Sequence, residues 1–369
     1  MLGFIKTKRD NSVKLDDVIE GLVEDRGLDR EKVIIAVCEG ILAAYNKKFP
    51  QYEFSVSFNK KTREPEVFTK KQIVEDVQSE ESQILLKKAK KINTEASVGQ
   101  EIEVPFEEKI GRIEILVARQ VIANKIRKIE QDAVFAEFED KANTIVNGIV
   151  HKKERSGYVV QLGDVMTLLP LSGVIPGEIF RMGVPVRALL SEVLRTPRSD
   201  YQLILDRASA DFVKKLFEIE IPEIFEGIVE IKKIVRVPGY KTKIAVASHR
   251  KEIDPVGTCV GVDGVRIKPI LKELSGEKID VIQWDNSLEN LVKNSLKPAE
   301  VDKVEIVDDR TAMVWLAQDQ RSLAIGKLGR NILLASRLTG VEINLQQVSS
   351  DAEKDNKLED SLLESDTED

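Results

Sequence analysis

A segment that occurs twice in the last third of the sequence restricts its fold more than any other feature. CVGVDGVRIKPILKELSGEKIDVI occupies residues 259–282, and AIGKLGRNILLASRLTGVEINLQQ occupies residues 324–347. Each copy contains two helical runs and a final strand, and each follows a helical segment and two strand-like segments. The order helix–strand–strand–helix–helix–strand therefore occurs twice, which predicts two α+β repeats of one supersecondary unit.

Each copy carries the pattern G-x-x-G between its two adjacent helices. The four aligned glycines are Gly261, Gly264, Gly326 and Gly329. One such pair is a weak signal, because glycines also close helices in tight helix–helix turns. Two pairs in the same frame favour a surface that is used twice. Glycine lets a sugar–phosphate backbone approach the peptide, and the N-terminus of the following helix favours a phosphate. The arrangement resembles the type II KH domain, whose GXXG loop holds about four nucleotides of RNA.

The two loops differ in charge, so we expect them to bind RNA unequally. In the first loop, Asp263 places a carboxylate where a phosphate would lie, a repulsion of about 1 kcal/mol at an exposed site. The cations of the next turn offset part of it. The second loop carries cations instead, so it is expected to be the better phosphate site. The candidate RNA-binding residues of the two loops are Gly261, Val262, Asp263, Gly264, Arg266 and Lys268, and Gly326, Lys327, Leu328, Gly329, Arg330 and Asn331.

Residues 144–207 are rich in short strands and predict a small closed barrel. Five strand-like segments with tight turns occur within this stretch, as in a five-stranded barrel of the OB type. Beside KH domains such a barrel resembles an S1 domain, which stacks bases on aromatic rings and holds phosphates with neighbouring cations. Packing of Tyr158 and Tyr201 in the barrel, and solvation of the cations, are the alternatives. The candidate RNA-binding residues here are Lys152, Lys153, Arg155, Tyr158 and Arg207.

The first third of the chain predicts an α+β unit that ends in a long helix. Residues 13–48 show two helical patterns, and Asp29 is placed to cap the second. Residues 52–77 alternate in the manner of a β-hairpin. A helix is expected from about Ile110 to Asp140, long enough to act as a rigid connector.

Charge and composition limit the possible functions. The last 21 residues contain nine acids and two lysines, so this tail alone accounts for the net charge of −7. The remaining body is neutral, and nucleic acid stays possible as a partner. The tail is expected to be disordered. It either competes with RNA for the KH surface or is an inert, solvated segment.

Sequence signals for catalysis, export and disulfides are weak. The two cysteines, Cys38 and Cys259, lie far apart and read as buried small hydrophobes of a reducing cytoplasm. There is no apolar stretch long enough for a signal peptide or a membrane span. The two histidines show no metal-ligand spacing, and GKLG lacks the spacing of a Walker loop. We therefore expect a cytoplasmic protein without catalytic residues, cofactor, metal or membrane contact.

The whole succession of elements resembles the NusA family of bacterial transcription factors. The segments that carry the resemblance are RIEILVARQVIANKIR, IEIPEIFEGIVEIKKIVRVPGYKTKIAV, IDPVGTCVGVDGVRIKPILKELSGEKIDVIQW and LAIGKLGRNILLASRLTG. The resemblance predicts a multidomain α+β chain. A polymerase-binding domain that includes the connector helix would occupy residues 1–140, an S1 barrel residues 141–208, and tandem type II KH domains residues 209–284 and 285–348. The acidic tail at 349–369 follows.

This resemblance also implies a function and a set of partners. The N-terminal domain would dock on RNA polymerase near the RNA exit channel, and the barrel and KH domains would bind emerging single-stranded RNA. The outcome would be control of pausing, intrinsic termination and antitermination by a monomer that works with other elongation factors. Two alternatives remain: an RNA-processing protein associated with an exoribonuclease, and a ribosome-associated RNA-binding protein.

Overall fold

The structure, a computed structural model, describes residues 15–347 and has the expected mixed α+β character. The chain divides into two compact units, with residues up to 140 and residues 195–197 in the first and the remainder in the second. The acidic tail predicted for 349–369 lies outside the described residues. Among the helices that the structure describes, none is long and apolar enough to cross a membrane.

The described part of the first unit combines four α-helices with a small sheet. Helices α1 (Leu15–Arg26) and α2 (Arg30–Lys48) are followed by strands β1 (Phe54–Asn59) and β2 (Glu64–Val74), which form the expected antiparallel hairpin. Asp29 caps α2 as predicted, since its carboxylate accepts a hydrogen bond from the Lys32 backbone at 3.0 Å. The cap satisfies one of the backbone N–H groups that a helix start leaves free.

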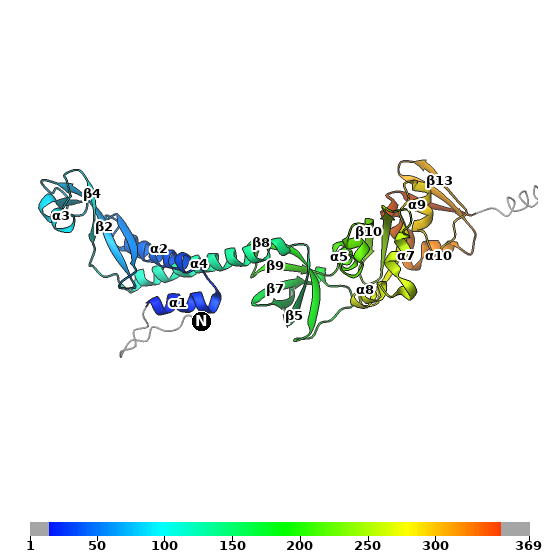
Figure 1. Cartoon of the computed structure of the whole chain (residues 1–369), viewed down its shortest axis with the longest axis horizontal. Helices are drawn as coiled ribbons and strands as arrows, with labels where there is room; N and C mark the ends of the chain where they lie inside the picture. The colour runs from blue at the N-terminus through cyan, green and yellow to red at the C-terminus, as the bar shows by residue number, and fades with distance from the viewer. Residues whose placement is uncertain (1–14, 348–369) are drawn as a thin grey trace, which may run out of the picture. The chain divides into compact units, whose positions relative to one another are not determined.

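The sheet of this unit is completed by short elements, and a long helix closes it. Strand β3 (Gln83–Leu85) pairs parallel to β2, helix α3 (Leu86–Ile92) follows, and β4 (Glu101–Pro105) pairs antiparallel to β2. Helix α4 (Arg112–Phe138) packs along α2 (Figure 1). Ile122 and Ile126 of α4 contribute to the apolar cluster around Ile19, Val33 and Val37.

The second unit begins with a closed five-stranded barrel. Its strands are β5 (Ile145–Lys153), β6 (Gly157–Leu162), β7 (Val165–Pro170), β8 (Pro185–Arg198) and β9 (Tyr201–Asp206), in the spatial order β5-β6-β7-β9-β8. The sequence pattern therefore predicted both the number of strands and the closure. Closure removes the exposed sheet edges that would otherwise pair with other chains.

The two repeats follow the barrel with the predicted element order. The first contains α5 (Ala210–Glu220), β10 (Val229–Val237), β11 (Lys241–Ser248), α7 (Pro255–Val260), α8 (Ile267–Glu273) and β12 (Lys278–Gln283). The second contains α9 (Leu288–Ser295), β13 (Lys303–Asp308), β14 (Thr311–Leu316), α10 (Arg321–Ile325), α11 (Arg330–Thr339) and β15 (Glu342–Gln347). A short helix, α6 (Pro222–Phe225), is an addition that only the first repeat has among the described elements.

Both repeats have the same sheet topology. β10 pairs antiparallel with β11 and β11 pairs parallel with β12, and the same holds for β13, β14 and β15. The helices of each repeat cover one face of its sheet. The other face of the first sheet packs on the second repeat through a cluster that includes Ala245, Ile282, Leu291 and Leu338. This apolar contact joins the two repeats directly.

Candidate nucleic-acid interface

The two glycine loops have the same backbone conformation. Gly261 has φ 75° and ψ 166°, and Gly326 has φ 71° and ψ 175°. The third loop residue is left-handed in both, at φ 50° for Asp263 and φ 57° for Leu328. Residues separated by 65 positions thus adopt one geometry, which supports the repeat inferred from sequence.

The two glycines of the second loop serve different needs. A Cβ added to Gly326 would lie 2.7 Å from Cβ of Asn331, so this glycine is required by packing inside the loop. A Cβ added to Gly329 would meet nothing within 4 Å among the described atoms. Gly329 therefore faces open space, where a phosphate backbone can approach the peptide closely.

The charges around the loops differ as the sequence predicted. In the second loop Lys327 is exposed, Leu328 is 79% exposed, and α11 begins directly after it. In the first loop Asp263 is exposed beside Val262, while Arg266 forms an ion pair with Glu223 at 2.8 Å. Arg266 is therefore neutralised within the protein and offsets little of the Asp263 charge, whereas Lys268 stays exposed. The second loop is the more cationic of the two.

Asn331 is not exposed at the surface of the second loop. Its side chain is buried, and its Nδ2 donates to the carbonyl oxygens of Leu296, Leu323 and Ala324 at 3.1–3.3 Å. Its role is to hold the end of α10 and the start of α11 in place. Sequence led us to expect that Asn331 contacts RNA. This positioning role replaces that expectation, because both polar atoms of the side chain already bond within the protein: Nδ2 to the three carbonyl oxygens and Oδ1 to Nζ of Lys241.

The second loop also touches the first repeat. The guanidinium of Arg330 lies 4.3 Å from the ring centroid of Tyr240, and Nζ of Lys241 donates to Oδ1 of Asn331 at 3.1 Å. Both partners come from the β10–β11 turn and the start of β11. Neither Tyr240 nor Lys241 was identified from sequence. The signal that could have indicated them is their position directly after Gly239, at the turn between two predicted strands.

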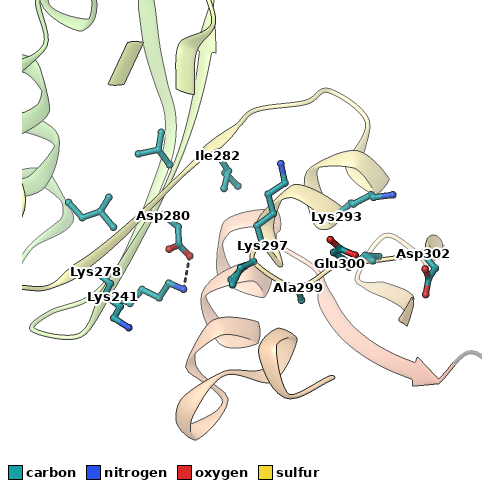
Figure 2. A pocket seen from close by; sticks show the side chains of 13 residues that line it. Lys241, Lys278, Asp280, Ile282, Lys293, Lys297, Ala299, Glu300 and Asp302 are labelled. Carbon is teal, nitrogen blue, oxygen red and sulfur yellow. Dashed lines mark ion pairs between the residues drawn. The ribbon is translucent and has the colours of Figure 1, made fainter. Parts of the chain in front are cut away.

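Beside this junction lies a cavity of about 970 Å³ between β12 and the segment after α9. Figure 2 shows Lys241 and Lys278 on one side and Glu300 and Asp302 on the other. One carboxylate oxygen of Asp280, a lining residue, forms ion pairs with Nζ of Lys241 at 2.6 Å and with Nζ of Lys243 at 2.7 Å. Burial lowers the pKa of Lys243, and Asp280 opposes that shift. The cavity thus carries both signs of charge.

Comparisons with known proteins assign these regions to one family. Three family descriptions match the chain: the NusA N-terminal domain at residues 14–132, the NusA-like first KH domain at 207–284 and the NusA-like second KH domain at 288–353. A protein of Halalkalibacterium halodurans named transcription termination/antitermination protein NusA is 35% identical over 354 residues, which cover 95% of this chain and 92% of that protein. The chain belongs to the NusA family.

Two further NusA proteins are similarly close. That of Bacillus subtilis is 34% identical over 91% of this chain and 91% of its own length, and that of Thermus thermophilus is 33% identical over 90% and 89%. The two repeats are therefore the tandem KH domains of the NusA family. The likeness that the sequence segments predicted is confirmed along most of the chain.

In this NusA-family chain the barrel residues singled out from sequence take different roles. Lys152 pairs with Glu154 at 2.7 Å, and this hydrogen bond raises the pKa of Lys152. Lys153 lies 5.4 Å from the ring centroid of Tyr158 and is exposed, as is Arg155. The exposed side chains of Lys152, Lys153 and Arg155 thus lie together at the β5–β6 turn.

Two of the predicted barrel residues are structural. The ring of Tyr158 is only 2% exposed and packs edge-to-face on Phe180 at 5.3 Å, so it offers no face to a base. Arg207 is 3% exposed and bonds to the carboxylates of Glu178 and Glu273 at 2.6 Å. These buried pairs join the barrel to the first KH domain, and a guanidinium so occupied is not available to a phosphate. Both predictions of direct RNA contact are corrected on this ground.

The described range contains both cysteines and other potential metal ligands. Within residues 15–347, no group of three or more His, Cys, Asp or Glu side chains is placed to hold a metal ion. Cys259 is buried, and burial raises its pKa to about 12, while Cys38 is half-buried. Cys259 therefore behaves as the small core hydrophobe that the sequence suggested.

Proposed function

We propose that this chain is a transcription elongation factor that binds RNA polymerase and nascent single-stranded RNA and modulates pausing, intrinsic termination and antitermination. The observation that carries the proposal is the second KH loop, where Lys327 is exposed, Gly329 opens onto free space and α11 begins. Relatives named transcription termination/antitermination protein NusA support the same role. It is a regulatory role and requires no catalytic residues.

RNA contact is proposed to be divided among three places. The second KH loop is the main phosphate site, the first loop is weaker because of Asp263, and Lys152, Lys153 and Arg155 of the barrel add a cationic patch. The residues proposed from sequence keep this role except Tyr158, Arg207 and Asn331, which pack internally. Since few cations are involved, the affinity for RNA alone should be modest and moderately salt-dependent.

The first unit offers apolar surface for polymerase. Ile35 is 57% exposed and lines a cavity of about 310 Å³ together with Ile34, Leu42 and Phe58. Exposed apolar side chains that surround a small pocket are typical of protein–protein contacts. We assign this face to RNA polymerase, near the RNA exit channel that the family resemblance implies, and we keep the proposed boundaries of the four domains at residues 140, 208, 284 and 348.

Attachment to polymerase would make weak RNA binding sufficient. A second binding event on one tethered complex is intramolecular, and its effective concentration reaches the millimolar range for short tethers. The acidic tail, which lies outside the described residues, is proposed either to compete with RNA or to be inert. Other elongation and antitermination factors are proposed to join the same complex, with this chain as a monomer in the cytoplasm.

The test is a transcription assay with the full chain and a loop variant. The variant Lys327→Asp/Leu328→Asp replaces two exposed loop residues by carboxylates. The pause duration of RNA polymerase, which the parent chain should lengthen, should with this variant return toward the duration measured when no chain is added. The matched control is Val307→Asp/Arg310→Asp, which makes the same changes at exposed positions of the same domain. Equal pausing with both variants, or failure of the parent chain to copurify with RNA polymerase, would contradict the proposal.

A further inference from the structure

A second cavity of the first KH domain has the chemistry of a nucleotide site. It has a volume of about 500 Å³ and lies where β11 and β12 end and α7 begins. Its walls bring together the segment 247–255, the end of β12 with Trp284 and Asn286, and Lys232 of β10. This volume is within the usual range of small-molecule sites. None of these residues belongs to the GVDG loop.

Trp284 supplies an aromatic surface that is held in place. Its backbone N–H donates to the Val246 carbonyl at 2.8 Å, and its indole Nε1 donates to Oδ1 of Asn286 at 3.3 Å. The buried part of the ring packs on the cluster of Ala245, Ile282 and Leu291. Trp284 is only partly buried and also lines the cavity, so a base that stacks on it would not have to order the side chain first.

The polar lining is cationic. Lys232, His249, Arg250 and Lys251 contribute to the walls, and no carboxylate is found among the lining residues in this described part of the chain. Glu230 lies close by and is engaged, because its carboxylate contacts Lys232 at 2.6 Å and His249 at 3.2 Å. Arg250 and Lys251 have no ion-pair partner among residues 15–347, and both are exposed.

The turn that carries these two cations is ordered by its own hydrogen bonds. Oγ of Ser248 donates to the Arg250 carbonyl at 2.8 Å and accepts from the Arg250 backbone N–H at 3.0 Å. The cations are thus presented at the mouth of the cavity that Trp284 lines. An aromatic plane with free cations beside it is the usual combination for binding a base and its phosphate.

We propose that this cavity binds one nucleotide, with the base stacked on Trp284 and the phosphate held by Arg250 and Lys251. The site lies at one end of α7 and the GVDG loop lies at the other, about 9 Å away for six helical residues. A short stretch of single strand spans that distance. The nucleotide is therefore part of the RNA that the KH domains hold, and the site compensates for the Asp263 carboxylate of the weak first loop. This inference rests on the proposed RNA binding.

The larger cavity of Figure 2 is the poorer candidate for such a ligand. Its walls also carry the carboxylates of Glu300 and Asp302, and Asp280 already pairs with Lys241. The Trp284 cavity has no carboxylate among its described lining residues, and Arg250 and Lys251 stay unpaired there although Glu230 holds Lys232.

The test uses the full chain with Trp315→Phe, which leaves Trp284 as the only tryptophan of the two in the sequence. A single-stranded RNA of about ten nucleotides is titrated, and the indole emission and the anisotropy of a labelled RNA are both recorded. RNA should quench Trp284 at the concentration at which it binds. A nucleoside monophosphate is titrated in parallel. Quenching by the monophosphate at lower concentration than by RNA would assign the site to free nucleotides and overturn its place in the RNA track.

The cations are tested by Arg250→Ala/Lys251→Ala in the same background. Each phosphate contact to a single strand contributes about 0.7 to the slope of log affinity against log salt, so the slope should fall by about 1.4. Lys90→Ala/Lys91→Ala removes two exposed cations of α3 and should leave the slope unchanged. RNA binding without quenching and with an unchanged slope would refute the nucleotide site and leave the proposed function intact. Absence of any RNA binding would refute the proposed function instead.

Discussion

Lys241 of the first KH domain donates a hydrogen bond from Nζ to Oδ1 of Asn331, 3.1 Å away in the second KH domain. Asn331 is the second residue after the GKLG loop, and its Nδ2 donates to the carbonyl oxygens of Leu323 and Ala324 before that loop and of Leu296 at the end of α9. One buried amide therefore links the fold of the second loop to the position of the first domain. The shape of the phosphate site and the junction between the domains depend on the same side chain.

Replacement of Asn331 by alanine should destabilise the second KH domain. The carbonyl oxygens of Leu323 and Ala324 lose this donor, whereas that of Leu296 still accepts from the Ala299 backbone N–H. A buried polar group left unpaired costs about 1–3 kcal/mol, so we expect a loss of about 2–3 kcal/mol. Urea denaturation followed by Trp315 fluorescence in a Trp284→Phe background measures it, because Trp315 lies in β14 of that domain. Asn290→Ala, at an exposed position of α9, is the matched control. A loss no larger than that of the control would show that Asn331 does not hold the loop.

The fold was predictable because its main features repeat or alternate locally. The duplicated G-x-x-G frame gave the element order of both KH domains, and strand alternation gave the barrel. The roles of single side chains were harder to predict. Arg207 meets Glu178 and Glu273, which are 29 and 66 residues away in the sequence. Tyr158 is buried against Phe180. Burial and pairing of this kind depend on contacts between distant segments, which a linear pattern does not contain.

The same limit explains why the Trp284 cavity was missed. Its lining comes from β10, from the β11–α7 turn and from the end of β12, and each piece looks unremarkable by itself. Arg250 and Lys251 read as solvated charges until the tryptophan is placed beside them. Arg266 shows the converse: it reads from sequence as a free cation beside the loop, but its guanidinium pairs with Glu223 at 2.8 Å.

The two glycines of GKLG should differ in their sensitivity to alanine. Gly326 combines φ 71° with ψ 175°, a region that only glycine adopts readily, and a Cβ there would strike Asn331. Gly329 is left-handed with open space around it, so alanine there should cost about 1–2 kcal/mol. Gly326→Ala should therefore lower the urea midpoint clearly more than Gly329→Ala.

Aspartate at Gly329 completes that comparison. Gly329→Asp adds a carboxylate at the open position and should reduce RNA affinity much more than Gly329→Ala, while the two variants unfold at similar urea concentrations. Similar RNA affinities for both variants would mean that no phosphate approaches Gly329.

Reversal of the charge at Asp263 should strengthen RNA binding. The exposed carboxylate repels a phosphate by about 1 kcal/mol, and a lysine replaces that repulsion by attraction. Asp263→Lys should thus tighten RNA binding about five- to thirtyfold at low salt, and the gain should shrink as salt is added. Anisotropy titrations at two salt concentrations measure it. Asp309→Lys, an exposed position in the second KH domain, controls for net charge. An equal gain in both variants would remove the first loop from the RNA surface.

Cys259 should make the chain less stable in alkali. Its pKa is raised by burial from an ordinary 9.0 to about 12, so the native thiol stays protonated where the unfolded thiol ionises. Its contribution to stability is fully present below pH 9.0 and is lost as the pH rises from 9.0 to 12. Cys259→Ala removes this contribution, and the decline in the urea midpoint between pH 8.5 and 10.5 should become shallower than in the parent chain.

Cys38→Ala provides the comparison for this effect. Burial raises the pKa of the Cys38 thiol as well, but that thiol is only half-buried, so its removal should change the alkaline decline less. A thiol reagent at pH 8 gives an independent measure, since it should modify Cys38 in the native chain and Cys259 only after urea is added. Rapid modification of Cys259 in the native chain, or the same alkaline decline with and without it, would show that the thiol is not enclosed by the core of the first KH domain.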